Sequence, residues 1–280
     1  MLALLCAVLA SVMVSVLLKL ASARGLDVAQ MVAWNYPTAA LLGRLALAPP
    51  QAFAADALPW PTLGLLGVLL PCIFLALGAS VRSAGIVRTE VAQRLSLLFS
   101  LLAAFFLFGQ TWTPRLAAGL LLGGLALVGL LARGPRETAA TSGARYWPLV
   151  VCAGFAAIDV LLKHVAAVGV PLAVSLPTMF TLATPVALLM ALWPARRTPF
   201  TLRNLAAGVL LGALNFGNIY AYLAAHRALP DQPARVFAGM NLGVVALGTL
   251  VGVGVFGERL RWPNVLGLML AAVAIVLLAR

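Results

Sequence analysis

Two oppositely charged side chains lie one helical turn apart in the otherwise apolar stretch 146–168. Asp159 and Lys163 are four positions apart, and Phe155 lies four positions before Asp159, so a helix would present all three on one face. The two charges could neutralise each other as a structural salt bridge. They could instead hold the ammonium and carboxylate groups of a zwitterion, or Asp159 could carry a proton.

A second charged face begins the stretch 88–108. Glu90, Gln93 and Arg94 fall on one side of a helix, and Arg94 lies too far inside the stretch for an easy escape to water. A guanidinium in that position is a natural partner for a substrate carboxylate. Glu90 could equally neutralise Arg94 in place, and the spacing favours neither interpretation.

Polar side chains also form a stripe on the stretch 202–225. Asn215, Asn218 and Tyr222, followed by His226, recur at three- and four-residue spacing. This pattern predicts either a cavity wall or hydrogen bonds to a neighbouring helix.

Three further residues complete the candidate binding set. Ser15 lies on a serine-rich face of the stretch 2–23, and Phe237 and Asn241 lie in the stretch 231–256. We expect Phe237 to cover a substrate side chain together with Phe155 and Tyr222. Asn241, a lone amide, is more typical of a packing hydrogen bond than of a ligand contact.

Other patterns predict structure. Thr178, Thr181 and Thr184 can return their hydroxyls to their own helix backbone beside Pro185. Close helix packing is predicted by glycines four positions apart, in the pairs Gly119/Gly123, Gly208/Gly212, Gly239/Gly243 and Gly248/Gly252.

The amino-acid composition indicates what kind of environment surrounds these residues. Of 280 residues, 63% are hydrophobic and 9% are charged, against roughly 45–50% and about 25% in soluble domains. Too few charged side chains are present to cover a water-exposed surface, which excludes a soluble enzyme or a disordered chain. The net charge of +12 comes from basic residues at the ends of apolar runs, as in headgroup anchoring, so we expect no nucleic-acid partner.

Ten apolar runs are long enough to cross about 30 Å of hydrocarbon. Glycine, proline and charged residues separate them. The runs are 2–23, 28–47, 61–82, 88–108, 115–132, 146–168, 171–193, 202–225, 231–256 and 262–279.

Short motifs repeat in the same order in the two halves of the chain. Residues 1–133 and 146–280 would each hold five helices, joined by the polar loop 134–145. Because five is odd, the second half would be inverted, as in many secondary transporters. The matching motifs are Leu17-Leu18-Lys19 with Leu161-Leu162-Lys163, Pro37-Thr38-Ala39 with Pro185-Val186-Ala187, and Phe108-Gly109-Gln110 with Phe256-Gly257-Glu258.

These motifs carry a resemblance to a known group of membrane proteins. In each half a Gly-Gln or Gly-Glu pair precedes a glycine on the next predicted helix, Gly119 or Gly267. With ten helices in two repeats, the chain resembles the drug/metabolite transporter superfamily, and within it the EamA-type and YddG-type amino-acid exporters. Gln110 stands where many members carry glutamate.

The fold class that we expect is an all-α polytopic membrane protein, with ten transmembrane helices as two inverted five-helix repeats around a central cavity. The resemblance implies a secondary transporter, not an enzyme, that exports amino acids by alternating access. Arg94 or Lys163 would meet the substrate carboxylate, and Glu90 or Asp159 the ammonium. Protons are a candidate coupling ion, and no cofactor or metal is expected.

Other classes stay open beside this expectation. A multidrug or other metabolite carrier would share the fold, and a membrane-embedded enzyme or a channel represents a different class. The bias toward arginine, alanine and leucine is typical of a GC-rich bacterium, hence of an inner membrane. A monomer suffices to enclose a site, and a dimer stays open. The count of basic residues favours termini outside the cell, whereas the resemblance favours termini in the cytoplasm.

Overall fold

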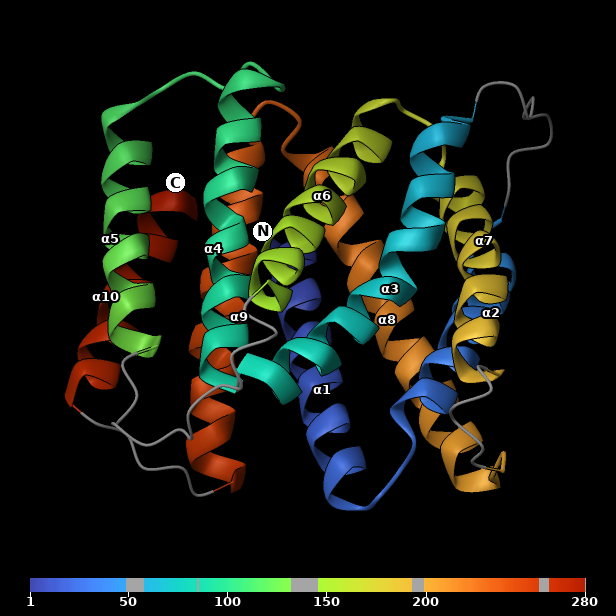
Figure 1. Ribbon diagram of the computed structural model, residues 1–280. Helices are drawn as coiled ribbons and strands as arrows, with labels where there is room; N and C mark the ends of the chain where they lie inside the picture. Colours follow the sequence, from blue (N-terminus) through green and yellow to red (C-terminus); the bar gives the residue numbers. More distant parts are fainter. Residues whose placement is uncertain (49–57, 85, 132–145, 193–198, 257–261, 280) are drawn as a thin grey trace.

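The chain folds into helices, as Figure 1 shows for a computed structural model that describes residues 1–48, 58–84, 86–131, 146–192, 199–256 and 262–279. These residues form ten α-helices and no strand. Each helix lies within a few residues of a run predicted from the sequence, so the all-helical prediction is confirmed. The helices are α1 (Leu2–Ala23), α2 (Val28–Ala46), α3 (Trp60–Ala84), α4 (Ile86–Phe106), α5 (Pro114–Leu131), α6 (Trp147–Ala167), α7 (Leu172–Leu192), α8 (Leu202–Ala228), α9 (Pro233–Phe256) and α10 (Trp262–Ala279).

Local sequence explains several helix ends. The side chain of Asp27 accepts hydrogen bonds from the backbone amides of Ala29 and Gln30 and so caps the start of α2. Proline is the first residue of α5 and of α9, where its missing N–H has no helical partner to lose. Gly25 has a φ of +65° just after α1, a conformation that glycine adopts without strain.

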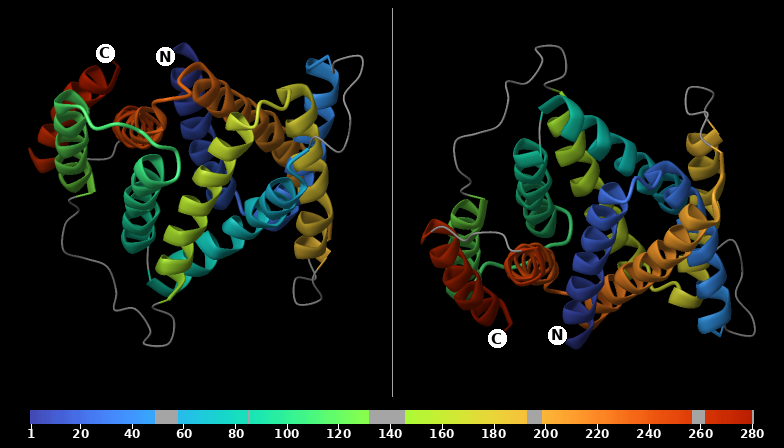
Figure 2. Two further views of the ribbon diagram at one scale, coloured as in Figure 1. Left: turned by 90° about the horizontal axis from the view of Figure 1, so that it is seen from above. Right: turned by 90° about the horizontal axis from the view of Figure 1, so that it is seen from below.

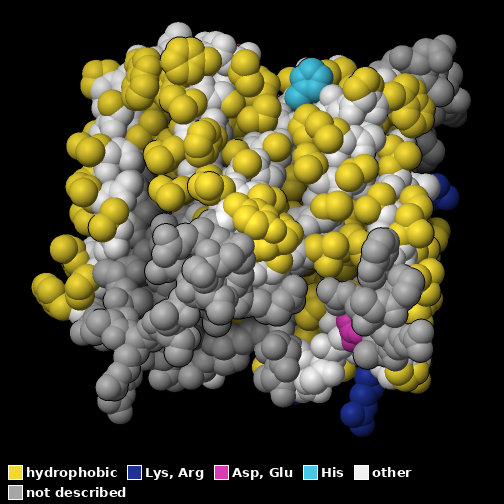
Figure 3. All heavy atoms as spheres, viewed as in Figure 1, with side chains coloured by type: hydrophobic (Ala, Val, Ile, Leu, Met, Phe, Trp, Pro, Cys, Tyr) yellow, Lys and Arg dark blue, Asp and Glu magenta, His cyan; other side chains and the backbone are white. Residues whose placement is uncertain are grey.

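Within the described residues, five helices are long and apolar enough to span a membrane, namely α3, α6, α7, α8 and α9. Shorter apolar segments lie in α1, α4, α5 and α10, within the residues that the structure describes. Hydrophobic side chains predominate on the described part of the face seen in Figure 3, with few charged ones among them. These features indicate a membrane protein, whereas ten membrane crossings stay a prediction.

The helices are arranged with two pairs at opposite ends of the bundle (Figures 1 and 2). Helices α5 and α10 pack together at one end, and α2 and α7 at the other. Between them α1 packs on α8 and α9, α3 packs on α6 and α7, and α4 packs on α6 and α9. The candidate binding residues all lie on this central group.

Glycine allows the closest of these contacts. A Cβ at Gly208 would lie 2.8 Å from the carbonyl oxygen of Met31, and one at Gly212 would lie 2.6 Å from that of Asn35. Gly119, Gly123, Gly239 and Gly243 also pack closely against other helices, as predicted. The prediction is wrong for Gly248, because no atom of the described residues lies within 4 Å of a Cβ there.

We expect Gly212→Ala to weaken the contact between α8 and α2, because the added methyl group must displace backbone as well as side-chain atoms. The free energy of unfolding should fall by about 1–3 kcal/mol. Gly217→Ala is the matched control on the same helix, since no atom in the described part of the chain lies within 4 Å of its Cβ, and alanine favours a helix by about 1 kcal/mol over glycine. Thermal unfolding in detergent compares the two variants. Equal stability would contradict the proposed packing.

Candidate functional site

The carboxylate of Asp159 lies where three helices meet. On α6 it accepts a hydrogen bond from the Ser100 hydroxyl of α4 at 2.9 Å and one from the Tyr222 hydroxyl of α8 at 3.0 Å. Each carboxylate oxygen takes one of these bonds. Arg94, also on α4, lies close enough for its charge to act on Asp159. The structure therefore brings Asp159 and Tyr222 of the candidate set into contact, with Arg94 within electrostatic range of them on α4.

An aromatic cluster extends from Tyr222 toward α9. The ring of His226 lies 4.8 Å from the ring of Tyr222 and 5.0 Å from that of Phe237, edge to face in both cases. His226 is only 1% exposed, and neither ring nitrogen has a hydrogen-bond partner in the described part of the chain. Phe237, a candidate from the sequence, thus lies two rings away from the Asp159 carboxylate.

Lys163 does not pair with Asp159, although the two lie one turn apart. Its Nζ donates a hydrogen bond to the carbonyl oxygen of Pro230 at 2.7 Å and lies 5.6 Å from the centroid of the Phe108 ring. The side chain is buried. A backbone carbonyl beyond α8 therefore replaces the ion pair that the four-residue spacing allowed.

The two asparagines of the α8 stripe bind neighbouring helices. Asn215 donates to the side-chain oxygen of Asn35 on α2 at 3.1 Å, and Asn218 donates to the carbonyl oxygen of Ala7 on α1 at 2.8 Å. For these two residues the structure has the interhelical hydrogen bonds that the spacing allowed. Tyr222 alone, among the three stripe candidates, reaches Asp159.

The remaining candidates lie apart from the carboxylate or contact their own helix. Ser15 is exposed and donates to the carbonyl of Ser11, and Asn241 donates to that of Phe237 at 3.0 Å. Gln93 is half-buried on α4, and Phe155 packs against the main hydrophobic core. The side chain of Glu90 lies outside the described residues.

Two polar residues that join helices, Ser100 at the site and Gln110 at the start of α9, were not among the candidates. Ser100 follows Ser96 by four positions in an apolar helix, a spacing that could have marked it. Gln110 accepts a hydrogen bond from the backbone amide of Ala234 at 2.6 Å and so caps the first turn of α9. The sequence identified Gln110 only as part of a repeated motif.

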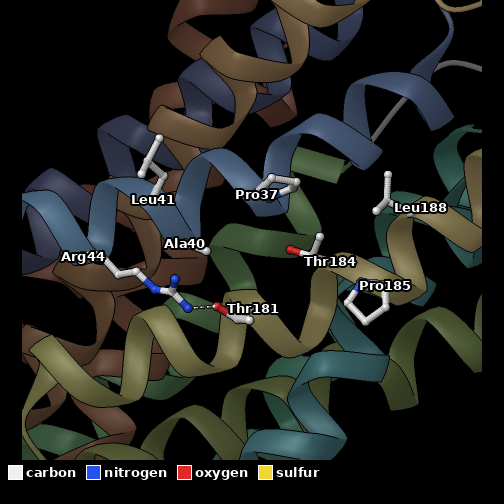
Figure 4. Close-up of a pocket in the computed structure, with 8 residues that line it drawn as sticks. All are labelled: Pro37, Ala40, Leu41, Arg44, Thr181, Thr184, Pro185 and Leu188. Carbon is white, nitrogen blue, oxygen red and sulfur yellow. Dashed lines mark hydrogen bonds between the residues drawn. The ribbon is translucent and has the colours of Figure 1, made fainter.

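A cavity of about 400 Å³ lies away from Asp159, between α2 and α7 (Figure 4). Pro37, Ala40, Leu41 and Arg44 line it from α2, and Thr181, Thr184, Pro185 and Leu188 from α7. The threonines return their hydroxyls to their own helix, as predicted: Thr181 donates to the carbonyl of Pro177 and Thr184 to that of Phe180. In the described ranges no three His, Cys, Asp or Glu side chains are grouped to hold a metal ion.

We expect Tyr222→Phe to lower the free energy of unfolding by about 1.5–3 kcal/mol, because it removes a hydrogen bond to a carboxylate and leaves the ring contact with His226. Tyr220→Phe is the control on the same helix, since the described residues offer that exposed hydroxyl no hydrogen bond and its ring stacks on Phe216. Melting temperatures in detergent provide the measurement. A loss of the same size in both variants would show that the bond to Asp159 adds nothing.

A comparison with other proteins finds a relative whose sequence matches nearly the whole chain. No family model matches the sequence. An uncharacterized protein of Haemophilus influenzae is 37% identical over 276 residues, which cover 96% of this chain and 94% of the relative. A solved crystal structure shares the fold with a TM-score of 0.71 at 18% identity, over 99% of this chain and 94% of that one. The chain therefore belongs to the same family as the Haemophilus influenzae protein.

Proposed function

We propose that the protein is a secondary transporter that exports amino acids, or similar small zwitterionic metabolites, across a bacterial inner membrane by alternating access. The observation that carries the proposal is the Asp159 carboxylate, held by Ser100 and Tyr222 among apolar helices. The proposal takes the protein to be a carrier and not an enzyme.

The position of this carboxylate favours a working group over a structural one. An ionised side chain at the centre of a bilayer costs about 2.5–3.5 kcal/mol even on the lenient insertion scale. A neighbouring lysine would offset that cost most simply, yet Lys163 donates to Pro230 instead. The hydrogen bonds to Asp159 come from two neutral hydroxyls, which can release it to a substrate ammonium or to a proton, while Arg94 offsets part of the cost of its charge.

Arg94 supplies the complementary charge for a zwitterion. It lies on α4, which also carries Ser100, and its charge acts on Asp159. A carboxylate and a guanidinium in one group of helices match the ammonium and carboxylate of an amino acid. The rings of Tyr222, His226 and Phe237 would cover the substrate side chain.

The packing of the helices supports two inverted five-helix repeats. In the two predicted repeats α1 corresponds to α6, α2 to α7 and α3 to α8. The contact of α1 with α8 therefore corresponds to that of α6 with α3, and the contact of α2 with α8 corresponds to that of α7 with α3. Equivalent helices also meet in three pairs, α2 with α7, α4 with α9 and α5 with α10. In Figure 1 α5 and α10 run in opposite directions. An exchange of contacts between halves is expected of inverted repeats, which place a substrate site at their interface.

Counterflow in proteoliposomes tests the function directly. Vesicles loaded with one unlabelled amino acid at a time should take up labelled threonine, methionine or phenylalanine only when the protein is present. Competition by other amino acids would then rank their affinities. If no amino acid gives a signal with folded, monodisperse protein, the proposed substrate class is wrong. Uptake of amphipathic drug cations in the same vesicles would then support a multidrug carrier.

We expect Asp159→Asn to lower counterflow at least tenfold while the protein stays folded, because an amide keeps the shape but loses the charge that attracts an ammonium group. A proton-coupled carrier would also lose its response to a pH gradient. Asp27→Asn is the matched control, since Asp27 caps α2 away from the site and asparagine caps a helix about as well. Transport by Asp159→Asn at the rate of the unmodified protein would contradict the proposal.

A further inference from the structure

We propose that the groove between α2 and α7 is a binding site for an anionic phospholipid, with an acyl chain along the groove and the headgroup phosphate on Arg44. This inference is independent of the transport function. It rests on the shape of the groove, the chemistry of its walls and the single charged side chain among the residues that line it.

The hollow is bounded by helix-interior prolines and small side chains. Pro37 on α2 and Pro185 on α7 face it, with Ala40 beside Pro37 (Figure 4). Its volume of about 400 Å³ is in the range of sites that hold small molecules, about 300–1,000 Å³. Leu41 is 56% exposed, so the groove lies on a surface that an apolar solvent can reach.

The side chains that line the groove can pack against an acyl chain, but they offer few hydrogen bonds to a polar ligand. The Thr181 hydroxyl donates to Pro177 at 2.7 Å and the Thr184 hydroxyl to Phe180 at 2.9 Å. Both hydrogens are therefore used within α7. The other lining side chains, apart from Arg44, are proline, alanine and leucine. A sugar or a peptide would leave its polar groups unpaired against these walls.

Arg44 gives the groove one charged end. It lies in the last turn of α2 and is exposed, and one of its terminal nitrogens donates to the Thr181 hydroxyl at 3.1 Å (Figure 4). The rest of the guanidinium is exposed, so an anion can reach its other N–H groups. A planar guanidinium binds phosphate oxygens in pairs, which selects a lipid with a net negative headgroup.

A lipid bound here would contact both halves of the chain. Pro37 and Pro185 occupy equivalent positions in the two predicted repeats, and α2 and α7 pack directly on each other. An acyl chain in the groove would therefore stabilise this contact without touching Asp159.

Native mass spectrometry of the detergent-purified protein tests the site. The protein is titrated with dioleoylphosphatidylglycerol or with dioleoylphosphatidylcholine. We expect one phosphatidylglycerol to bind more tightly than phosphatidylcholine, and Arg44→Gln to weaken only the former, about fivefold, the factor for one basic residue near an anionic headgroup. Thr184→Phe should weaken both lipids because its ring fills the groove.

Two controls and a soluble anion make the outcome decisive. Arg115→Gln removes an exposed charge from the first turn of α5, and Leu189→Phe enlarges an exposed side chain of α7 outside the groove. Both should bind lipid as the unmodified protein does. Equal binding of the two lipids, or no effect of Arg44→Gln, would overturn the proposal. Displacement of phosphatidylglycerol by inorganic phosphate at the same concentration would assign the site to a soluble anion instead.

Discussion

A carboxylate among apolar helices needs hydrogen-bond donors from its neighbours, and in this protein Asp159 imposes that requirement. Its two donors come from α4 and α8. Each of these helices must therefore keep a fixed rotation about its own axis and a fixed position along that axis relative to α6. The contact of Tyr222 with His226, and of His226 with Phe237, extends the same constraint to α9. One half-buried carboxylate thus links four helices, α4, α6, α8 and α9, which come from both halves of the sequence.

Helix α8 contacts helices of the other half of the chain through both close glycine packing and side-chain hydrogen bonds. Gly208 and Gly212 bring its backbone against α2. The amide of Asn204 donates to Gln30 on α2 at 2.7 Å, and that of Asn218 donates to Ala7 on α1. A movement of one sequence half against the other would have to break these contacts. A movement of α1, α2 and α8 as one group would keep them, and so a rigid group need not follow the chain order.

The sequence predicted the helices far better than the partners of their polar side chains. Helix ends follow from local signals such as Asp27, Gly25 and the prolines that begin α5 and α9, and these act within a few residues. The partners of Asp159 lie 59 and 63 residues away along the chain, and they depend on how each helix is rotated in the bundle. The i, i+4 rule paired Asp159 with Lys163, but the Pro230 carbonyl competes for the lysine. Thr181 and Thr184 followed the prediction because their acceptors lie on their own helix.

The bond from the Ala234 amide to the Gln110 side chain joins the connection after α4 to the start of α9 across the middle of the sequence. A single hydrogen bond of this kind contributes about 1 kcal/mol net, close to twice the thermal energy. A contribution of this size biases α9 toward one arrangement about fivefold. The Gln110 side chain therefore favours one arrangement of α9 without fixing it.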